Sequence, residues 1–121
     1  MTYIAIDGDD IGRRITAMYL RNDPVSLSAF AAMVQDKVHQ IAKTLRARGF
    51  TVVFCAADGV AAHSDSALSG TSELYQLIQS IGGNELTFSA GVGGSLREAY
   101  VALLAAKSNG KAQIVTYGDI A

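Results

Sequence analysis

Several residue types that would restrict the chemistry of this chain are scarce in it. The 121 residues include one cysteine, Cys55, which excludes an intrachain disulfide framework and indicates a reducing compartment. No apolar run approaches the roughly 18 to 20 residues that cross a bilayer, and the N-terminus lacks a basic segment followed by a hydrophobic one. We therefore expect a soluble, cytoplasmic protein that does not insert directly into a membrane.

Charge is also sparse. Charged residues make up 17% of the chain, and ten basic against eleven acidic residues leave a net charge of -1. This balance provides no basic surface for the phosphates of duplex nucleic acid, whereas a small ligand that brings its own cation fits better. Repeats and linkers are absent and the single proline, Pro24, marks no boundary, so residues 1–121 are predicted to form one domain.

Apolar residues, in contrast, are plentiful and regularly spaced. They make up 50% of the chain, and the mean hydropathy is +0.24, which suffices for a genuine core. The patterns predict strands over residues 2–7, 50–55, 60–64, 85–94 and 112–117, and helices over 9–20, 26–48, 70–83 and 95–107. This order predicts an α+β fold: a ferredoxin-like split βαβ core with a mixed sheet of about five strands and helices packed mainly on one face.

Polar residues at the helix starts predict how the helices are capped. Ser26 or Ser28 is the expected cap of the long helix, and Thr71 or Ser72 that of the next. In the last helix, Ser95 lies three residues before Glu98, which is the spacing of a capping box.

Acidic residues gather where the first strand ends, in the stretch "YIAIDGDDIG". A purely structural interpretation is that Asp7, Asp9 and Asp10 form a turn and the first turn of a helix. In this interpretation Asp58, in "AADG", is a hairpin residue. If the first strand lies beside the hairpin, however, Asp7 and Asp58 meet at one edge of the sheet. The sequence then predicts a shared acidic site.

Such a site requires either raised pKa values or a cation. A like-charge pair at about 4 Å costs on the order of 4 kcal/mol at an effective dielectric near 20. Oxygen ligands without a nearby His or Cys select a hard ion, Mg²⁺ or Mn²⁺, and Mg²⁺ held by a few carboxylates is the usual setting for a bound triphosphate. The pattern therefore favours a metal and nucleotide site.

Two lysines support this interpretation, and other candidates do not. Lys107 lies on the inward side of an apolar helix face, where either a phosphate or simple snorkelling explains it, and Lys111 allows the same two explanations. The glycines of "GVGGS", residues 91–95, lack the full pattern of a phosphate-binding loop and are interpreted as a tight turn. His39 and His63 are expected at the surface, and without a nearby Asp or Ser partner they support no hydrolytic triad.

Three spaced motifs together resemble a known family. "YIAIDGDDIG", "FCAADGV" and "FSAGVG" followed by "AYVALLAAKSNGK" are similar to the palm domain of the CRISPR polymerase and diguanylate cyclase superfamily, most closely the minimal CRISPR polymerases (mCpol). The resemblance spans nearly the whole chain. It implies a ferredoxin-like palm of the nucleotidyl cyclase type that joins ATP into a cyclic dinucleotide or cyclic oligoadenylate signal in anti-phage defence. It also implies two Mg²⁺ or Mn²⁺ ions, a homodimer and a nucleotide-responsive effector.

The resemblance also assigns roles to individual residues. Asp7 and Asp58 correspond to catalytic, metal-binding aspartates, and the Gly8 carbonyl to a further metal ligand. The hairpin departs from the family pattern, because Ala56 and Ala57 replace two glycines and a second acid is missing; Asp10 or Asp9 is the candidate substitute. The residues that the resemblance assigns to nucleotide binding are Asp9, Asp10, Ile11, Gly12, Lys107 and Lys111.

Other functions remain open at this stage. The departures in the hairpin allow a catalytically degenerate palm that binds nucleotide as a sensor. A hydrolase of the cyclohydrolase kind on the same scaffold is a further option. A response-regulator receiver has a similar length, an acidic pair, a phospho-accepting Asp, here Asp58, and a late Lys. It requires, however, an additional strand and helix where residues 26–48 predict one helix.

Overall fold

The computed structural model describes residues 1–67 and 70–120. In this part of the chain, strands and helices follow the predicted order. Their bounds are β1 Thr2–Gly8, α1 Ile11–Leu20, α2 Pro24–Ala47, β2 Thr51–Ala56, β3 Gly59–Ser64, α3 Thr71–Gly82, β4 Phe88–Gly93, α4 Leu96–Ser108, β5 Ile114–Thr116 and a 3₁₀ helix Tyr117–Asp119.

The strands form one mixed sheet in the order β2-β3-β1-β4-β5. Strand β1 is central and pairs antiparallel with both β3 and β4, whereas β5 lies parallel to β4. The predicted α+β fold is therefore confirmed. The receiver alternative is wrong, because that fold is built on a parallel sheet with a different strand order.

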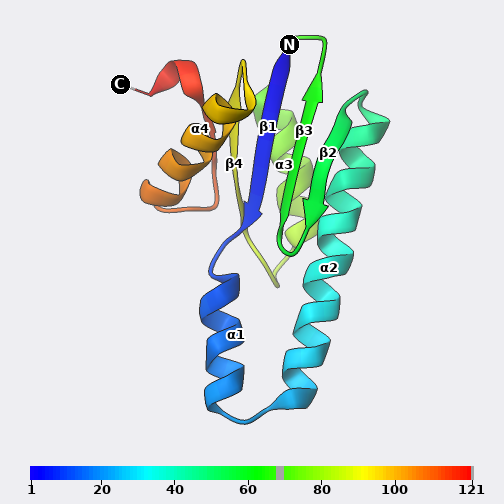
Figure 1. Cartoon of the computed structure of the whole chain (residues 1–121), viewed down its shortest axis with the longest axis vertical. Helices are drawn as coiled ribbons and strands as arrows, with labels where there is room; N and C mark the ends of the chain where they lie inside the picture. Colours follow the sequence, from blue (N-terminus) through cyan, green and yellow to red (C-terminus); the bar gives the residue numbers. More distant parts are fainter. Residues whose placement is uncertain (68–69, 121) are drawn as a thin grey trace.

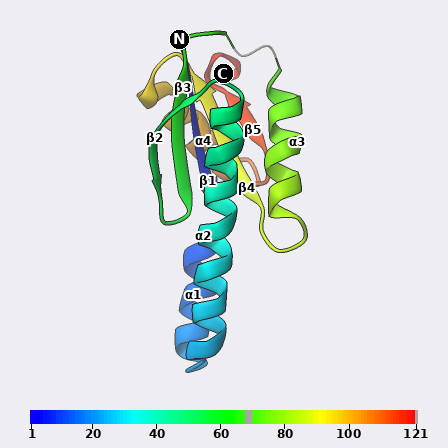
Figure 2. The ribbon, with the colours of Figure 1, turned by 90° about the vertical axis from the view of Figure 1, so that its right-hand side faces the viewer.

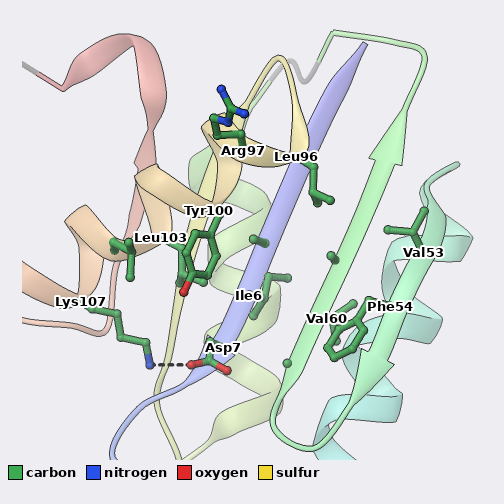
Figure 3. Close-up of a pocket in the computed structure, with 14 residues that line it drawn as sticks. Ile6, Asp7, Val53, Phe54, Val60, Leu96, Arg97, Tyr100, Leu103 and Lys107 are labelled. Atoms are coloured by element: carbon green, nitrogen blue, oxygen red, sulfur yellow. Dashed lines mark ion pairs between the residues drawn. The ribbon is translucent and has the colours of Figure 1, made fainter.

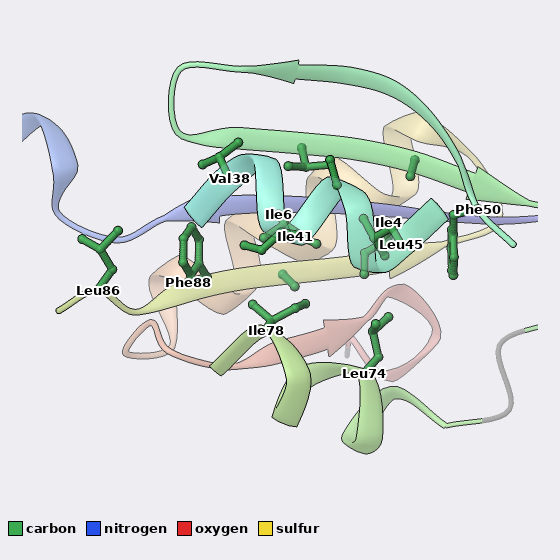
Figure 4. Close-up of a cluster of buried hydrophobic side chains, with 14 of the residues drawn as sticks. Ile4, Ile6, Val38, Ile41, Leu45, Phe50, Leu74, Ile78, Leu86 and Phe88 are labelled. Carbon is green, nitrogen blue, oxygen red and sulfur yellow. The ribbon is translucent and has the colours of Figure 1, made fainter. Parts of the chain in front are cut away.

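The helices lie on both faces of the sheet (Figures 1 and 2). Two of them, α2 and α3, cover one face, which carries the main core and confirms that the helices pack mainly on this side. Figure 4 shows this core, in which Ile4 and Ile6 of β1 and Phe88 of β4 meet Ile41 of α2 and Ile78 of α3. Of the helices in the described part of the chain, α4 covers the opposite face, through a small cluster of Ala5, Ala99 and Leu103. This asymmetry leaves part of the α4-side face open.

Two of the predicted helix caps are wrong. Asp23 caps α2, where its carboxylate accepts a hydrogen bond from the backbone N–H of Ser26 at 3.0 Å, and Pro24 follows at the first helical position. Helix α3 begins after Gly70 without a side-chain cap. The expected cap of α4 is confirmed, since the Ser95 hydroxyl accepts from the backbone N–H of Glu98 at 3.1 Å.

Helix α1 begins later than predicted. Its first residue is Ile11, and Asp10 precedes it in the left-handed region, with φ at 60°. Asp9 and Asp10 therefore lie outside the first turn, and Asp10, at the N-cap, makes no side-chain capping hydrogen bond. From this start α1 and the first half of α2 extend beyond the sheet as a two-helix arm (Figures 1 and 2). None of the helices that the structure describes has the length and apolar composition to cross a membrane.

Glycines in β4 let α4 approach the sheet closely. A Cβ on Gly91 would lie 2.2 Å from the carbonyl oxygen of Ala99 and 2.2 Å from the amide nitrogen of Leu103, so only glycine fits. The prediction of a tight turn over 91–95 is thus wrong, because Gly91 and Gly93 belong to the strand and make room for helix backbone. This contact fixes the helix that carries Lys107.

Candidate active site at the end of strand β1

The end of β1 and the hairpin between β2 and β3 meet, as the acidic-site hypothesis requires. Asp7 lies opposite Gly59 in the β1–β3 ladder, and the backbone N–H of Gly8 donates to the carbonyl of Asp58 at 2.9 Å. Ala57 closes the hairpin with a positive φ of 51°. Fifty residues of chain therefore separate two aspartates that the fold places side by side.

The carboxyl group of Asp7 is under electrostatic stress. Its pKa is raised, first by burial and then by repulsion from Asp58, although Lys107 acts in the opposite direction. A raised pKa means that the surroundings disfavour the negative charge. The chain by itself therefore does not fully compensate this charge, and a cation would relieve it.

Lys107 supplies a positive charge among the same oxygens. Its ammonium lies 2.8 Å from the carbonyl oxygen of Gly8, 3.0 Å from Asp9 Oδ1 and 3.3 Å from Asp7 Oδ2. Figure 3 shows the Lys107–Asp7 pair at the end of β1. The acids of the chain itself therefore explain the inward position of Lys107, so neither a phosphate nor snorkelling is needed. Burial lowers the pKa of Lys107, but the two carboxylates outweigh it and raise the value.

Asp9 is the most buried acid of the site, with only 4% of its surface exposed. Its carboxylate accepts hydrogen bonds from Thr87 Oγ1 and Ser89 Oγ, each at 2.7 Å, and from the backbone N–H of Ala112 at 3.1 Å, in addition to Lys107. Burial alone would raise the pKa of Asp9, but these bonds lower it. All its acceptor positions face the protein, which makes Asp9 a positioning residue for Lys107.

Asp10 and Lys111 face each other rather than the Asp7–Asp58 pair. The Lys111 ammonium donates to Asp10 Oδ1 at 2.5 Å, and Arg13 lies 3.6 Å from the other oxygen of this carboxylate. Hydrogen bonding from Lys111 lowers the pKa of Asp10. In this arrangement Asp10 does not point toward Asp7, so its assignment as a metal ligand requires a change of side-chain conformation.

Backbone amides at the start of α1 lie beside this cluster. The first N–H groups of a helix have no partner within it, and the amides of Ile11 and Gly12 are in this position. Both residues also line a cavity of about 510 Å³ between α1 and α2, which Asp58 borders. The resemblance assigned Ile11 and Gly12 to phosphate binding, and the structure places them where an anion could reach them.

A second cavity, of about 910 Å³, lies on the other side of the aspartate pair. It is a groove between α4 and the open sheet face, and Asp7 and Lys107 border its polar end (Figure 3). Asp58 and Asp7 thus belong to two different cavities. The two carboxylates separate a pocket on the arm from a groove on the sheet.

The donor set at the end of β1 fits a hard divalent ion. Asp7, Asp58 and the Gly8 carbonyl offer oxygen ligands, and the Lys107 ammonium already places a positive charge against two of these groups. Among the described residues no three His, Cys, Asp or Glu side chains are arranged to hold a metal. Two carboxylates nevertheless suffice for Mg²⁺, which keeps water or substrate phosphate in its remaining positions.

Two polar residues that the sequence interpretation missed contribute to the site, whereas both histidines lie outside it. Thr87 and Ser89, which hold Asp9, were missed, although the polar residues that alternate with apolar Leu86 and Phe88 could have indicated them. His39 is exposed on α2. His63 lies at the far end of β3, where its ring packs against Tyr3 with centroids 5.4 Å apart.

Comparisons with known proteins identify the family and support the fold. A family model for the minimal CRISPR polymerase (mCpol) domain matches residues 3–117. No curated protein matches. The active GGEEF domain of a diguanylate cyclase from Vibrio cholerae is similar in structure, with a TM-score of 0.68, 14% identity and coverage of 96% of this chain and 81% of that one. The GGDEF domain of DgcB from Caulobacter crescentus, solved in complex with c-di-GMP, has a TM-score of 0.69, 15% identity and coverage of 98% and 78%.

Proposed function

This chain belongs to the minimal CRISPR polymerase family, and we propose that it is a metal-dependent nucleotidyltransferase that condenses ATP into a cyclic dinucleotide, such as cyclic di-AMP, or a cyclic oligoadenylate. The family and the palm fold support a polymerase or cyclase type of chemistry. The observation that carries the proposal is the convergence of Asp7, Asp58 and Lys107 at the end of the central strand. We further propose that the product is a second messenger in anti-phage defence.

In the proposed reaction a ribose hydroxyl oxygen of one nucleotide forms a bond with the α-phosphorus of another. The bond from this phosphorus to the bridging oxygen breaks, pyrophosphate leaves, and the hydroxyl proton passes to water. Asp7, Asp58 and the Gly8 carbonyl would hold the divalent ions, which would neutralise charge and lower the pKa of the hydroxyl.

The remaining residues position the phosphates. The free amides of Ile11 and Gly12 bind oxygens of the triphosphate, and the ammonium of Lys107, held by Asp9, balances the charge that develops on pyrophosphate. Lys111 is held near the start of α1 by Asp10, from where its flexible stem can reach a phosphate. No protein nucleophile takes part.

A homodimer completes the proposal. Ring closure joins two nucleotides twice, so a second reaction must present the other hydroxyl and phosphate to an aspartate pair. Two protomers that face one another provide two such pairs around one product.

The proposal is tested by product analysis. The purified chain is incubated with each NTP and with Mg²⁺ or Mn²⁺, and products are identified by mass spectrometry while pyrophosphate release is measured. We expect a cyclic product from ATP, and a rate at least about 100-fold lower for Asp7→Asn and Asp58→Asn, because each removes a carboxylate that holds a cation at the reacting phosphate. Asp65→Asn, which makes the same charge change at an exposed position, serves as the control.

A catalytically degenerate nucleotide sensor is the second candidate. It is favoured by the hairpin, where Ala56 and Ala57 precede the single acid Asp58. Saturable binding of ATP and Mg²⁺ without pyrophosphate release under any metal would contradict the polymerase proposal and support the sensor.

A further inference from the structure

The ammonium of Lys107 contacts two kinds of oxygen atom. Two of them, the carbonyl oxygen of Gly8 at 2.8 Å and Asp7 Oδ2 at 3.3 Å, belong to the groups that the proposed function assigns to divalent ions. The third is Asp9 Oδ1 at 3.0 Å, and Asp9 is not in that set. Figure 3 shows how the side chain reaches from α4 to Asp7. Lys107 therefore places a positive charge on two of the atoms that would bind an ion.

Of the two carboxylates that Lys107 contacts, the fold fixes only that of Asp9. Thr87 and Ser89 each donate to this buried carboxylate at 2.7 Å. The side chain of Asp7, in contrast, is 37% exposed and borders the groove on the α4 side of the sheet. A ligand from solvent can therefore take the place of Lys107 at Asp7 while the contact with Asp9 persists.

The side chain of Lys107 can change position, whereas its helix cannot. Helix α4 packs so closely on β4 that a Cβ on Gly91 would lie 2.2 Å from helix backbone atoms, which fixes the backbone of α4. Lysine carries its ammonium on a flexible four-carbon stem with three N–H donors. A change at the site therefore moves the ammonium without moving the element that carries it.

A divalent ion and this ammonium compete for the same oxygens. Bound to the Gly8 carbonyl and Asp7, the ion would lie only a few ångströms from an ammonium that contacts both groups, and like charges this close repel strongly. Mg²⁺ and Mn²⁺ carry twice the charge and bind carbonyl and carboxylate oxygens directly. We therefore expect the ion to displace the ammonium.

We propose that Lys107 is the resident counter-ion of the metal site, which a divalent ion displaces from Gly8 and Asp7 so that the ammonium turns about Asp9 toward the substrate phosphates. The inference rests on the proposed function and deepens it, because it gives Lys107 two successive positions. One N–H donor stays with Asp9, and the two that leave Gly8 and Asp7 become available to phosphate oxygens. Ion binding thus prepares Lys107 for the phosphates.

The first test measures the affinity for Mn²⁺ without nucleotide, with free Mn²⁺ quantified by electron paramagnetic resonance. If the ammonium occupies these oxygens in about nine molecules of ten, its removal lowers the dissociation constant about tenfold, and we expect at least this decrease for Lys107→Met. Lys37→Met is the matched control and should leave the constant unchanged, because the largely buried Lys37 contacts the carbonyls of Ile81 and Gly82 instead. An equal or higher constant for Lys107→Met, or no Mn²⁺ binding by either wild type or this variant, would overturn the inference.

The second test observes the ammonium itself in the wild-type chain, because the removal of any nearby positive charge favours a cation. The protein is labelled with ¹⁵N-lysine, Mg²⁺ is added, and the ammonium signals are followed by NMR, with Lys107 assigned through bonds from its backbone. We expect its signal to shift or broaden, while that of Lys37, hydrogen-bonded to two carbonyls, stays in place. An unchanged Lys107 signal while the backbone amides of Asp7 and Gly8 shift would show that the ion binds without displacing Lys107, and would refute the inference.

This inference and the proposed function fail in distinguishable ways. If the wild-type chain joins no nucleotides but Mg²⁺ still moves the Lys107 signal, the proposed function fails and the counter-ion role stands. If nucleotides are joined and Lys107→Met binds Mn²⁺ no more tightly than wild type, the counter-ion role is wrong and the proposed function stands.

Discussion

Replacing the buried Asp9 by asparagine tests how much its carboxylate contributes to the stability of the fold. The variant has the same shape and lacks the charge that four donors approach, namely Thr87, Ser89, Lys107 and the backbone N–H of Ala112. An asparagine oxygen can still accept from some of them, but its amide group faces the others. The ammonium of Lys107 then loses its most buried partner.

The expected cost follows from these contacts. Hydrogen bonds to a charged group contribute about 1.5–3 kcal/mol each, and they are not additive when they share one acceptor. Breaking a buried ion pair by removing one partner costs about 3–5 kcal/mol. We therefore expect Asp9→Asn to lower the free energy of unfolding by about 3–5 kcal/mol, against a total of roughly 6–18 kcal/mol for a domain of this length.

Urea denaturation followed by far-ultraviolet circular dichroism measures this difference. Asp10→Asn, next in the chain and paired at the surface with Lys111 and Arg13, is the control and is expected to change stability much less. The pKa of Asp9 in the fold lies below its ordinary value of 3.8, so the unfolded state takes up the proton first as pH falls. The stabilisation of the fold by ionised Asp9 is complete above about pH 5 and is lost below the pKa of Asp9 in the folded protein. The difference in free energy of unfolding between wild type and Asp9→Asn should therefore become smaller as the pH falls. Equal midpoints for the Asp9 and Asp10 variants at neutral pH would refute this account.

Two further predictions concern the packing of α4 on the sheet and the destabilisation of the fold by the charge of Asp7. Gly91→Ala should lower the melting temperature by roughly ten degrees or more, because its Cβ would overlap the backbone of α4. Gly118→Ala is the control, since a Cβ there would meet open space. Equal melting temperatures for the two variants would contradict the close contact. Asp7→Asn should raise the free energy of unfolding of the metal-free protein at pH 7, because the raised pKa of Asp7 means that its ionised form opposes folding. This destabilisation by the ionised carboxylate should decrease as the pH falls toward the pKa of Asp7 in the folded protein. A chelator-treated sample in urea measures the second effect, and a less stable variant would contradict it.

The sequence predicted the order of strands and helices along the chain, and it indicated the acidic pair, because both follow from local patterns. The apolar strand before Gly8 and the Asp-Gly hairpin fix where Asp7 and Asp58 lie once the strands are adjacent, and the structure places them together. The element order is likewise encoded in spacing, so the fold class followed. These features require no knowledge of side-chain conformation.

What failed depended on contacts between distant segments. Nothing near Asp9 indicates that Thr87 and Ser89, about eighty residues away, surround it, so Asp9 was interpreted together with Asp10. The role of Gly91 depends on the backbone of another element, which converts an apparent turn into a helix contact. A bulge between Val52 and Phe54 of β2 was also missed, because six apolar residues in a row carry no sign of which one is inserted.

The central position of β1 in the sheet determines the order in which the strands unfold locally. Strands β2 and β5 each bond to one neighbour, and β5 has only three residues, whereas β1 is bonded on both sides. On warming, the edge strands β2 and β5 should therefore fray first, while the amides of β1 stay protected from hydrogen exchange. Because Asp7 lies on the last strand to open and Phe54 on one of the first, warming should disorder the β2 side of the groove before it separates Asp7 from the hairpin.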